Sequence, residues 1–174
     1  MRRVLVMGCS GSGKSTFATA LAARLAVPYV SLDGMFWKPG WVEPDKAEFA
    51  AEVAAVTEHD SWVIDGNYTS HAGAIRRDRA DTVCLFDLPR LTCLAGVIRR
   101  SIASYGRVRP EMAPGCPEKV DFGFYRYVWT YRDVQHPKLL AYVGGLRDDQ
   151  RLATFTTRAD ADAFLAAVPP AGRA

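Results

Sequence analysis

The chain of 174 residues contains no apolar run as long as the roughly 18 residues that a membrane-spanning helix needs. Arg2 and Arg3, followed by apolar residues, resemble the start of a secretion signal, but those apolar residues continue directly into a glycine-rich loop. We therefore interpret them as a strand and not as a targeting segment. The sequence predicts a cytoplasmic protein that has no membrane partner.

Cysteine and histidine are too few and too scattered to indicate a disulfide framework or a zinc site. No two cysteines form a C-x-x-C pair, and the histidines show no ligand spacing. We predict reduced thiols and assign the histidines no role. The residues concerned are Cys9, Cys84, Cys93, Cys116, His59, His71 and His136.

A strong charge of either sign is also absent, since the net charge is only +3. Nucleic-acid-binding domains usually carry a basic stripe, so nucleic acid is not expected as a partner. The basic residues are nevertheless unevenly chosen: 17 are arginine and 5 are lysine, and ten of the arginines fall between Arg76 and Arg132. Arginine suits bidentate recognition of phosphate, although an arginine-rich composition with solvated surface charges is the alternative explanation.

A phosphate-binding loop is the most specific motif in the chain. Residues 8–15 read Gly-Cys-Ser-Gly-Ser-Gly-Lys-Ser and fit the pattern G-x-x-x-x-G-K-[ST] at every fixed position. An apolar run precedes the loop and a helical pattern follows it, so backbone N–H groups and a helix N-terminus converge on one anion. We predict that ATP binds here with Mg²⁺, although no motif separates ATP from GTP. The residues assigned to the nucleotide are Gly8, Ser10, Gly11, Ser12, Gly13, Lys14, Ser15 and Thr16.

Five short apolar runs predict strands that are buried on both faces, because most of them do not alternate. These runs are residues 4–7, 29–32, 62–64, 83–86 and 152–156. Helical patterns cover residues 15–25, 45–58 and 159–168, and two more are marked by Leu91, Leu94, Ile98 and Ile102 and by Tyr125, Val128 and Trp129. The alternation predicts one domain over residues 1–174 with a three-layer α/β P-loop NTPase fold. Its five-stranded parallel sheet would carry helices on both faces.

Two irregular segments follow the second predicted strand and the third predicted helix. Ligands of open α/β sheets bind beyond the carboxyl ends of the strands, so both segments should border the binding crevice. We predict an acceptor-binding insert at about residues 33–61 and a short arginine-rich lid at about residues 104–118. Such a lid excludes water during phosphoryl transfer.

The metal and acceptor sites are predicted from acids at the ends of strands. Ser15 is the expected direct Mg²⁺ ligand, and Asp65, which ends an apolar run and precedes Gly66, is the preferred second one. Asp33 precedes a glycine after the second strand and is expected to orient or deprotonate the acceptor, with a simple Asp-Gly turn as the alternative. Asp87 runs into a proline and is expected only to cap the next helix.

Lys14 should reach the β- and γ-phosphates, and lid arginines should stabilise the transferring group. Arg100 and Arg132 are the preferred pair. The wider set of candidates also includes Arg99, Arg107, Arg109 and Arg126, and Arg158 is placed beside the base from topology alone. Trp37 and Trp41 are expected either to stack on a planar acceptor or to fill a small satellite core.

These features together resemble the adenylate kinase group of small P-loop kinases. Residues 32–41 and 65–68, with the arginines of residues 99–109, look closer to the branch labelled DNA topology modulation protein, or FlaR-like. The likeness covers about residues 1–145 and implies an acceptor-binding region after the second strand and a lid. Unlike adenylate kinases, the chain continues from Asp65-Gly66 into Asn67-Tyr68 in place of Phe-Pro-Arg, and its lid has no zinc cysteines.

The sequence thus predicts an ATP- and Mg²⁺-dependent kinase that phosphorylates a small molecule, most readily a nucleotide or nucleoside. A kinase for a sugar acid or cyclitol is an alternative, because Asp33 suits a hydroxyl acceptor. A nucleotide-switched regulatory ATPase that acts on a macromolecule such as DNA is the alternative from a different class. A monomer or weak homodimer is expected.

Overall fold

The computed structural model describes residues 1–172 and contains one five-stranded sheet in which all strands are parallel. Its strands lie in the order β2-β3-β1-β4-β5, which confirms the predicted α/β fold class. The strands are β1 (Arg3–Gly8), β2 (Tyr29–Ser31), β3 (Trp62–Asp65), β4 (Thr82–Phe86) and β5 (Arg151–Phe155). Each predicted strand is found with its bounds shifted by at most one residue, because continuous apolar runs are typical of buried parallel strands.

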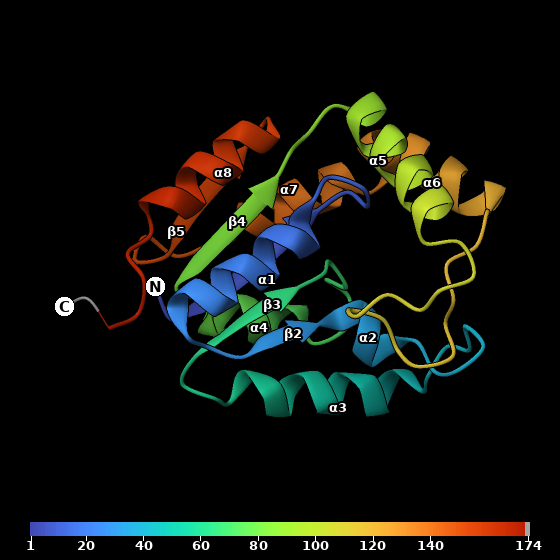
Figure 1. The fold of residues 1–174 in the computed structure, drawn as a ribbon. Helices are drawn as coiled ribbons and strands as arrows, with labels where there is room; N and C mark the ends of the chain where they lie inside the picture. The colour runs from blue at the N-terminus through green and yellow to red at the C-terminus, as the bar shows by residue number, and fades with distance from the viewer. Residues whose placement is uncertain (173–174) are drawn as a thin grey trace.

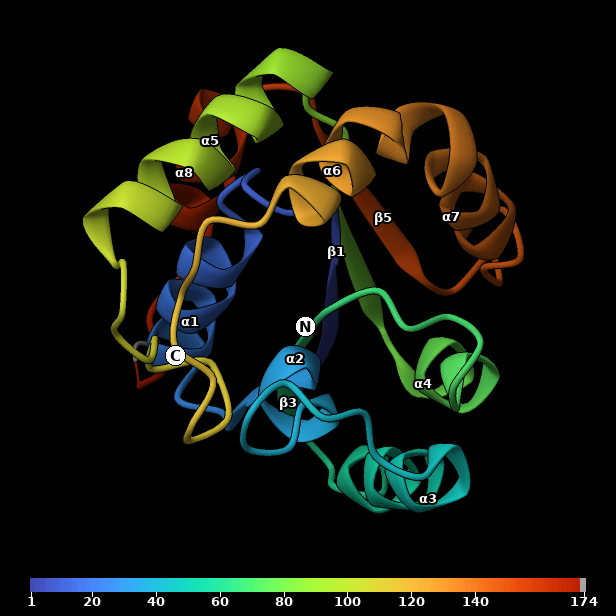
Figure 2. The same cartoon turned by 90° about the vertical axis from the view of Figure 1, so that its right-hand side faces the viewer.

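Helices cover both faces of the sheet. Figure 2 shows α1 and α8 on one side of the strands and α4 and α7 on the other, while α5 and α6 stand beyond the carboxyl ends of the strands in Figure 1. The longer helices are α1 (Lys14–Leu25), α3 (Lys46–Thr57), α5 (Arg90–Ala103), α6 (Phe122–Val134), α7 (His136–Val143) and α8 (Arg158–Ala167). Two shorter ones are α2 (Leu32–Phe36) and α4 (Gly73–Arg79).

Three of these helices, α2, α4 and α7, are not predicted from the sequence. Helices α2 and α4 have five and seven residues, which is too short for a periodic apolar pattern to stand out. Helix α7 begins directly after α6 with Pro137 in its first turn, and Gln135 lies between the two. Helix α3 is capped by Asp45, which accepts hydrogen bonds from the backbone N–H groups of Ala47 and Glu48.

The core between α1, α8 and the sheet is built from phenylalanine. Phe17 of α1 lies edge-on to Phe86 of β4 and Phe155 of β5, with 5.3 Å between ring centroids in both pairs. Phe155 meets Phe164 of α8 at the same distance. Edge-to-face contacts of this kind add to the free energy gained from burying the rings. The cluster fixes α1, and with it the loop that precedes this helix, against the centre of the sheet.

Helix α5 has the predicted apolar face, but much of that face points into solvent. Leu91 is 68% exposed and Ile102 is 72% exposed. The buried side of α5 instead carries the small residues Cys93, Val97 and Ser101. Small side chains are needed there because α5 packs closely against the glycine-rich loop, as described below.

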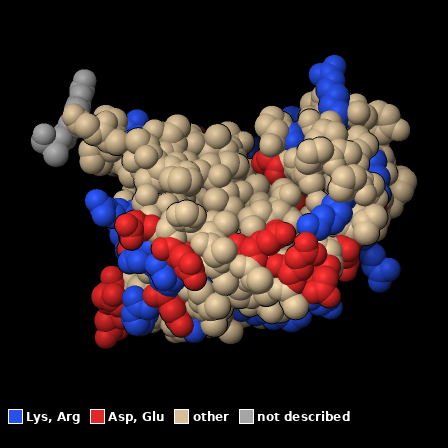
Figure 3. Space-filling model, turned by 90° about the horizontal axis from the view of Figure 1, so that it is seen from below, with Lys and Arg blue, Asp and Glu red and all other residues tan. Residues whose placement is uncertain are grey.

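Within the described residues 1–172, no helix is long and apolar enough to cross a membrane. Acidic and basic side chains alternate in mixed groups on the face drawn in Figure 3, with uncharged surface between them. The net charge of +3 is therefore not gathered into a basic stripe on this face.

Candidate active site

The glycine-rich loop connects β1 to α1 and is clamped by a close approach of α5. Gly11 has a φ of +81°, which glycine adopts without strain. A Cβ atom built on Gly96 of α5 would lie 2.1 Å from the Gly11 carbonyl oxygen, and one built on Gly11 would lie 2.1 Å from the Cys93 carbonyl oxygen. Both positions require glycine, so the shape of the loop depends on α5 as well as on the P-loop pattern.

Arg158 also holds the loop. Its Nη2 donates a hydrogen bond to the Gly11 carbonyl at 2.9 Å, and its Nε donates to the Ser12 carbonyl at 3.2 Å. Arg158 opens α8 directly after β5, where the sequence placed it near the base of the nucleotide. Because carbonyls that bond to Arg158 point away from the anion site, these contacts help to turn the N–H groups of the loop inward.

Lys14 and Asp65 face each other at the centre of the site. Lys14 Nζ lies 3.6 Å from Asp65 Oδ1, and both side chains are more than 90% buried. Burial on its own lowers the pKa of Lys14, but the Asp65 and Asp33 carboxylates raise it above its ordinary value. Burial raises the pKa of Asp65, against the opposing effects of Lys14 and Ser15. A buried lysine that stays charged is what a phosphate-binding role requires.

Asp65 and Ser15 form an oxygen-only donor set that fits Mg²⁺. Asp65 Oδ1 is buried and has no hydrogen-bond partner among the described residues, which is expected of an oxygen reserved for a cation. Mg²⁺ usually binds proteins through one or two carboxylates and substrate phosphates, and not through a complete protein cage. No cluster of three or more His, Cys, Asp or Glu residues that could hold a metal occurs in residues 1–172.

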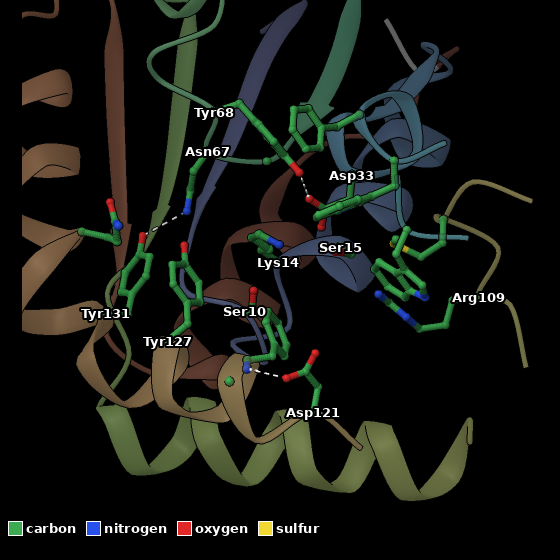
Figure 4. A pocket seen from close by; sticks show the side chains of 18 of the residues that line it. Ser10, Lys14, Ser15, Asp33, Asn67, Tyr68, Arg109, Asp121, Tyr127 and Tyr131 are labelled. Atoms are coloured by element: carbon green, nitrogen blue, oxygen red, sulfur yellow. Dashed lines mark hydrogen bonds between the residues drawn. The ribbon is translucent and has the colours of Figure 1, made fainter. Parts of the chain in front are cut away.

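A cavity of about 830 Å³ opens beside Lys14 and Ser15, and Figure 4 shows its interior. Asp33 and Tyr68 lie on one side of Lys14 in this view, and Tyr127 and Tyr131 lie on the other. The predicted insert, lid and phosphate loop all contribute to the lining. Its members include Ser10, Lys14, Ser15, Asp33, Phe36, Trp37, Trp41, Tyr68, Arg100, Arg109, Met112, Glu118, Tyr127, Tyr131 and Gln135.

Asp33 is in the first turn of α2 and is oriented by a residue that the sequence analysis did not single out. The Tyr68 hydroxyl donates a hydrogen bond of 2.8 Å to Asp33 Oδ1. Burial and the Asp33 carboxylate both raise the pKa of Tyr68, so its proton stays in place for this bond. Asp33 is therefore more than a turn residue: one of its oxygens is fixed, and the carboxylate lines the cavity.

The loop that carries Tyr68 is itself held from two directions. Asn67 exchanges hydrogen bonds with the backbone of Gly8 at 2.9 and 3.0 Å, and it donates a third to the Tyr131 hydroxyl. Arg76 is fully buried in α4 and donates from Nη2 to the carbonyls of Asn67 and Tyr68 at 2.9 and 2.7 Å. Asn67 thus links the end of β3 to the start of the phosphate loop.

The lid arginines meet at one buried carboxylate. Glu118 Oε2 lies 2.8 Å from Arg109 Nε and 3.3 Å from Arg100 Nε, and the Glu118 side chain is only 5% exposed. Ser101 donates to the other oxygen of Glu118 at 3.0 Å, and Arg109 also pairs with Glu111 at 2.6 Å. Arg100 lines the cavity as predicted, together with Arg109.

Arg132 lies outside this cavity. Its Nη1 pairs with Asp87 Oδ1 at 3.0 Å, and His136 Nε2 contacts the same oxygen at 3.0 Å. The three side chains line a separate small cavity behind the phosphate loop. The prediction that Asp87 caps the next helix is wrong, because α5 has Pro89 at its N-cap and no side-chain cap. Asp87 instead ties the end of β4 to α6 and α7.

Trp37 and Trp41 fill a small satellite core, which is one of the two roles that the sequence left open, while stacking on an acceptor stays a prediction. They meet edge-on with 5.5 Å between ring centroids and pack on a small core of Met112, Ala113 and Cys116. They also line the main cavity. The residues of this small core belong to the lid, whereas the two tryptophans belong to the insert. Their contact therefore connects the insert to the lid.

Sequence reasoning missed Tyr68, Asn67, Arg76 and Glu118. The first two directly follow Asp65-Gly66, so proximity to a strand end was an available signal. Arg76 and Glu118 gave no signal, since a charged residue in a helical or loop segment is usually solvated.

Comparison with known proteins supports the fold. No protein-family model matches the chain, and no curated protein matches it. A shikimate kinase from Bacteroides thetaiotaomicron has a TM-score of 0.56 at 14% identity, covering 95% of this chain and 94% of its own. A shikimate kinase from Acinetobacter baumannii, solved with shikimate, has a TM-score of 0.56 at 13% identity, covering 94% and 88%. A gluconokinase from Sinorhizobium meliloti has a TM-score of 0.51 at 16% identity, covering 95% and 91%. The chain therefore has the fold of these P-loop kinases.

Proposed function

We propose that this protein is a kinase that transfers the γ-phosphoryl group of ATP to a hydroxyl of a small molecule. The observation that carries the proposal is the arrangement of one cavity. Lys14 and Ser15 of the phosphate loop line it together with Asp33, whose carboxylate is oriented by Tyr68. Phosphoryl transfer needs a held donor and an aligned acceptor in one space from which water is excluded, and this cavity has groups for both.

Each residue has a role in this proposal. Lys14 and the loop N–H groups hold the donor phosphates. Ser15 and Asp65 would hold Mg²⁺, which neutralises charge on the phosphate oxygens when it is bound. Asp33 accepts a hydrogen bond from the acceptor hydroxyl, and its carboxylate can take the proton as that hydroxyl attacks.

The lid arginines are proposed to stabilise charge on the transferring group. Arg100 and Arg109 already line the cavity, so their charge would act on the transferring group while both stay paired with Glu118. Arg132 would first have to leave Asp87, and we therefore place Arg100 ahead of Arg132 in this role. A protein of this kind would act in the cytoplasm as a monomer or weak homodimer.

Two lines of evidence bear on the chemical class of the acceptor. The resemblance to the adenylate kinase group and its FlaR-like branch favours a nucleotide or nucleoside. The fold is shared with kinases named for shikimate and gluconate, which favours a hydroxylated metabolite. Both lines of evidence favour a small molecule whose hydroxyl or phosphate oxygen attacks the γ-phosphoryl group of ATP.

The test is acceptor-dependent ADP formation from ATP and Mg²⁺, measured against nucleosides, nucleoside monophosphates and hydroxylated metabolites. We expect one acceptor class to stimulate ADP formation many-fold and Lys14→Ala to abolish it. Lys46→Ala, which changes an exposed lysine of α3, is the matched control. Slow ATP hydrolysis that no acceptor stimulates would contradict the proposal and favour a nucleotide-switched regulatory ATPase.

A further inference from the structure

Resting on the proposed phosphoryl transfer, we propose that the acceptor is a neutral, hydroxylated ring compound that has an apolar ring face. Pyranosides, cyclitols and nucleosides have this chemistry, whereas nucleoside monophosphates, sugar phosphates and sugar acids do not. Two independent features of the cavity lead to this inference: the arginines at its acceptor end are already neutralised, and its walls are aromatic.

The acceptor end of the cavity is the part that Asp33 lines. Arg100 and Arg109, which also line the cavity, are paired with protein carboxylates. Glu118 Oε2 forms ion pairs with Arg100 Nε at 3.3 Å and Arg109 Nε at 2.8 Å, and Arg109 is also paired with Glu111. Glu118 is buried, and its other oxygen accepts a hydrogen bond from Ser101, so the charges of the two arginines are balanced by the carboxylates of Glu118 and Glu111. An anionic acceptor would compete with Glu118 for these arginines, and separating a buried carboxylate from its cationic partners is strongly unfavourable.

The remaining cations do not replace them. Lys119 Nζ lies 3.8 Å from Asp121 Oδ2 and 5.5 Å from the centre of the Trp41 ring. Lys138 lines the cavity from α7 but is exposed to solvent. Lys14 belongs to the donor phosphates. Among the described residues, the acceptor end therefore has no buried cation that is free to bind a phosphate or carboxylate.

The acceptor end does have a free hydrogen-bond acceptor. Tyr68 occupies Asp33 Oδ1, while Asp33 Oδ2 takes part in no hydrogen bond among the described residues. A carboxylate oxygen in this state attracts a hydroxyl donor and repels an anion. Gln135 lines the cavity from the opposite wall and adds a neutral amide that can both donate and accept. The polar groups on offer thus match hydroxyls.

The walls of the cavity are flat and apolar. On the side of the insert, Phe36 lies against Tyr68 with 4.8 Å between centroids and against Trp37 with 5.1 Å. On the side of α6, Phe124 is stacked with Tyr127 at an interplanar angle of 15°. Aromatic faces bind the C–H face of a sugar or cyclitol ring, or the plane of a base, through dispersion and burial of apolar surface. The ring of the acceptor would lie between these walls while one hydroxyl meets Asp33.

The first experiment compares neutral acceptors with their own anionic counterparts at saturating ATP and Mg²⁺. Each pair differs by one charged group: a nucleoside and its monophosphate, a pyranose and its 6-phosphate, a pyranose and its uronic acid. We expect the best neutral compound to exceed its counterpart at least about tenfold in kcat/KM, and the nucleoside and pyranoside arms distinguish the two sources of such a ring. A preference for the anionic member overturns this inference and leaves the kinase proposal standing. Absence of stimulation by every compound overturns the kinase proposal itself.

A second experiment changes the charge of the cavity. Glu118→Gln removes the carboxylate paired with Arg100, leaves Arg109 paired only with Glu111, and should raise kcat/KM for an anionic acceptor at least about tenfold relative to its neutral counterpart. Glu52→Gln, on the exposed side of α3, is the matched control and should leave the ratio unchanged. An unchanged ratio in a folded Glu118→Gln protein overturns the inference. If this variant does not fold, the comparison of wild-type acceptors decides alone.

Discussion

The Tyr68 hydroxyl donates a hydrogen bond of 2.8 Å to Asp33 Oδ1 across the mouth of the cavity. The two residues come from different segments, one following β2 and the other following β3, and they meet because neighbouring parallel strands end at the same edge of the sheet. Asp33 is thereby held in one orientation relative to Lys14. The proposed role of Asp33 toward the acceptor hydroxyl depends on this orientation.

Removing the hydroxyl in Tyr68→Phe should impair use of the acceptor and spare ATP binding. Hydrogen bonds to charged groups contribute roughly 1.5–3 kcal/mol, so we expect a loss of about 10- to 100-fold in kcat/KM for the acceptor. Steady-state kinetics with each substrate varied in turn measures both effects. Tyr105→Phe, which alters an exposed tyrosine of the lid, is the control. An equal loss of ATP affinity would show that Tyr68 supports the whole site and not Asp33.

Arg158→Ala should impair ATP binding and spare use of the acceptor. The variant loses two hydrogen bonds to the carbonyls of Gly11 and Ser12, so the phosphate loop is less well shaped for its anion. We expect ATP affinity to fall by up to about 30-fold, on the scale of roughly 1 kcal/mol for each of the two hydrogen bonds, with KM for the acceptor unchanged. Calorimetric titration of ATP gives the affinity, and Arg147→Ala on the exposed loop before β5 is the control. Unchanged ATP affinity would contradict a role for Arg158 in shaping the loop.

Gly96→Ala should destabilise the protein, although alanine usually stabilises a helix relative to glycine. The new methyl group would meet the Gly11 carbonyl at 2.1 Å, so α5 or the phosphate loop must move. Overpacking of this kind raises the free energy of the folded state by about 1–3 kcal/mol. Thermal unfolding should show a lower Tm together with weaker ATP binding. Gly123→Ala in α6 is the control, since a Cβ atom built there would lie 3.2 Å from its nearest neighbour, Asp121 Oδ1, and would not meet backbone as at Gly96. A higher Tm with full ATP binding would contradict the close contact of loop and helix.

Asp81 is expected to make stability depend on pH. Burial raises its pKa, but hydrogen bonds from the N–H groups of Arg3 and Arg2 and from the Thr82 hydroxyl outweigh this and lower the pKa below its ordinary value. The ionised form therefore stabilises the fold above about pH 4, and this contribution is lost as pH falls through the lowered value.

Asp81→Asn should accordingly lower the Tm by about 2–4 °C near pH 7, which corresponds to roughly 1 kcal/mol in a chain of this size. The difference from wild type should shrink as the pH falls below about 4 and through the lowered pKa of Asp81, because the wild-type carboxyl then also becomes neutral. Asp148→Asn, which changes an exposed residue in the loop before β5, serves as the control in the same series of melts. A constant difference at all pH values would show that the ionised carboxylate is not the stabilising form.

The sequence was sufficient for the sheet and the phosphate loop. Continuous apolar runs predict buried parallel strands, and the loop pattern between residues 4–7 and 15–25 has few other structural explanations. It was not sufficient for α2, α4 and α7, whose short or proline-containing segments form helices because the sheet beside them needs cover. The apolar face of α5 was correctly predicted. Its exposure to solvent was not predicted, because the orientation of α5 depends on the tight contact between Gly11 and Gly96.

The residues of the candidate site also fall into two groups, those that the sequence predicts and those that it does not. Lys14, Ser15, Asp33 and Asp65 are near one another because each follows a strand, and this can be deduced from topology. The assignment of arginines to carboxylates cannot be deduced in this way. Arg100 meets Glu118 across the base of the lid, and Arg132 meets Asp87 behind the loop, so contacts over 18 and 45 residues of sequence decide which arginine faces the cavity. Such pairs depend on the packing of α5 against α6.

The central claim is that Asp33 and the phosphate loop act on one phosphoryl group. Its most direct measurement follows the label from γ-³²P-ATP in wild type and in Asp33→Asn, with the preferred acceptor present. The account predicts that wild type moves the label onto the acceptor in equal amount to the ADP formed, and that Asp33→Asn binds ATP normally but loses most of this transfer. Full transfer by Asp33→Asn, or label released only as inorganic phosphate by wild type, would contradict it.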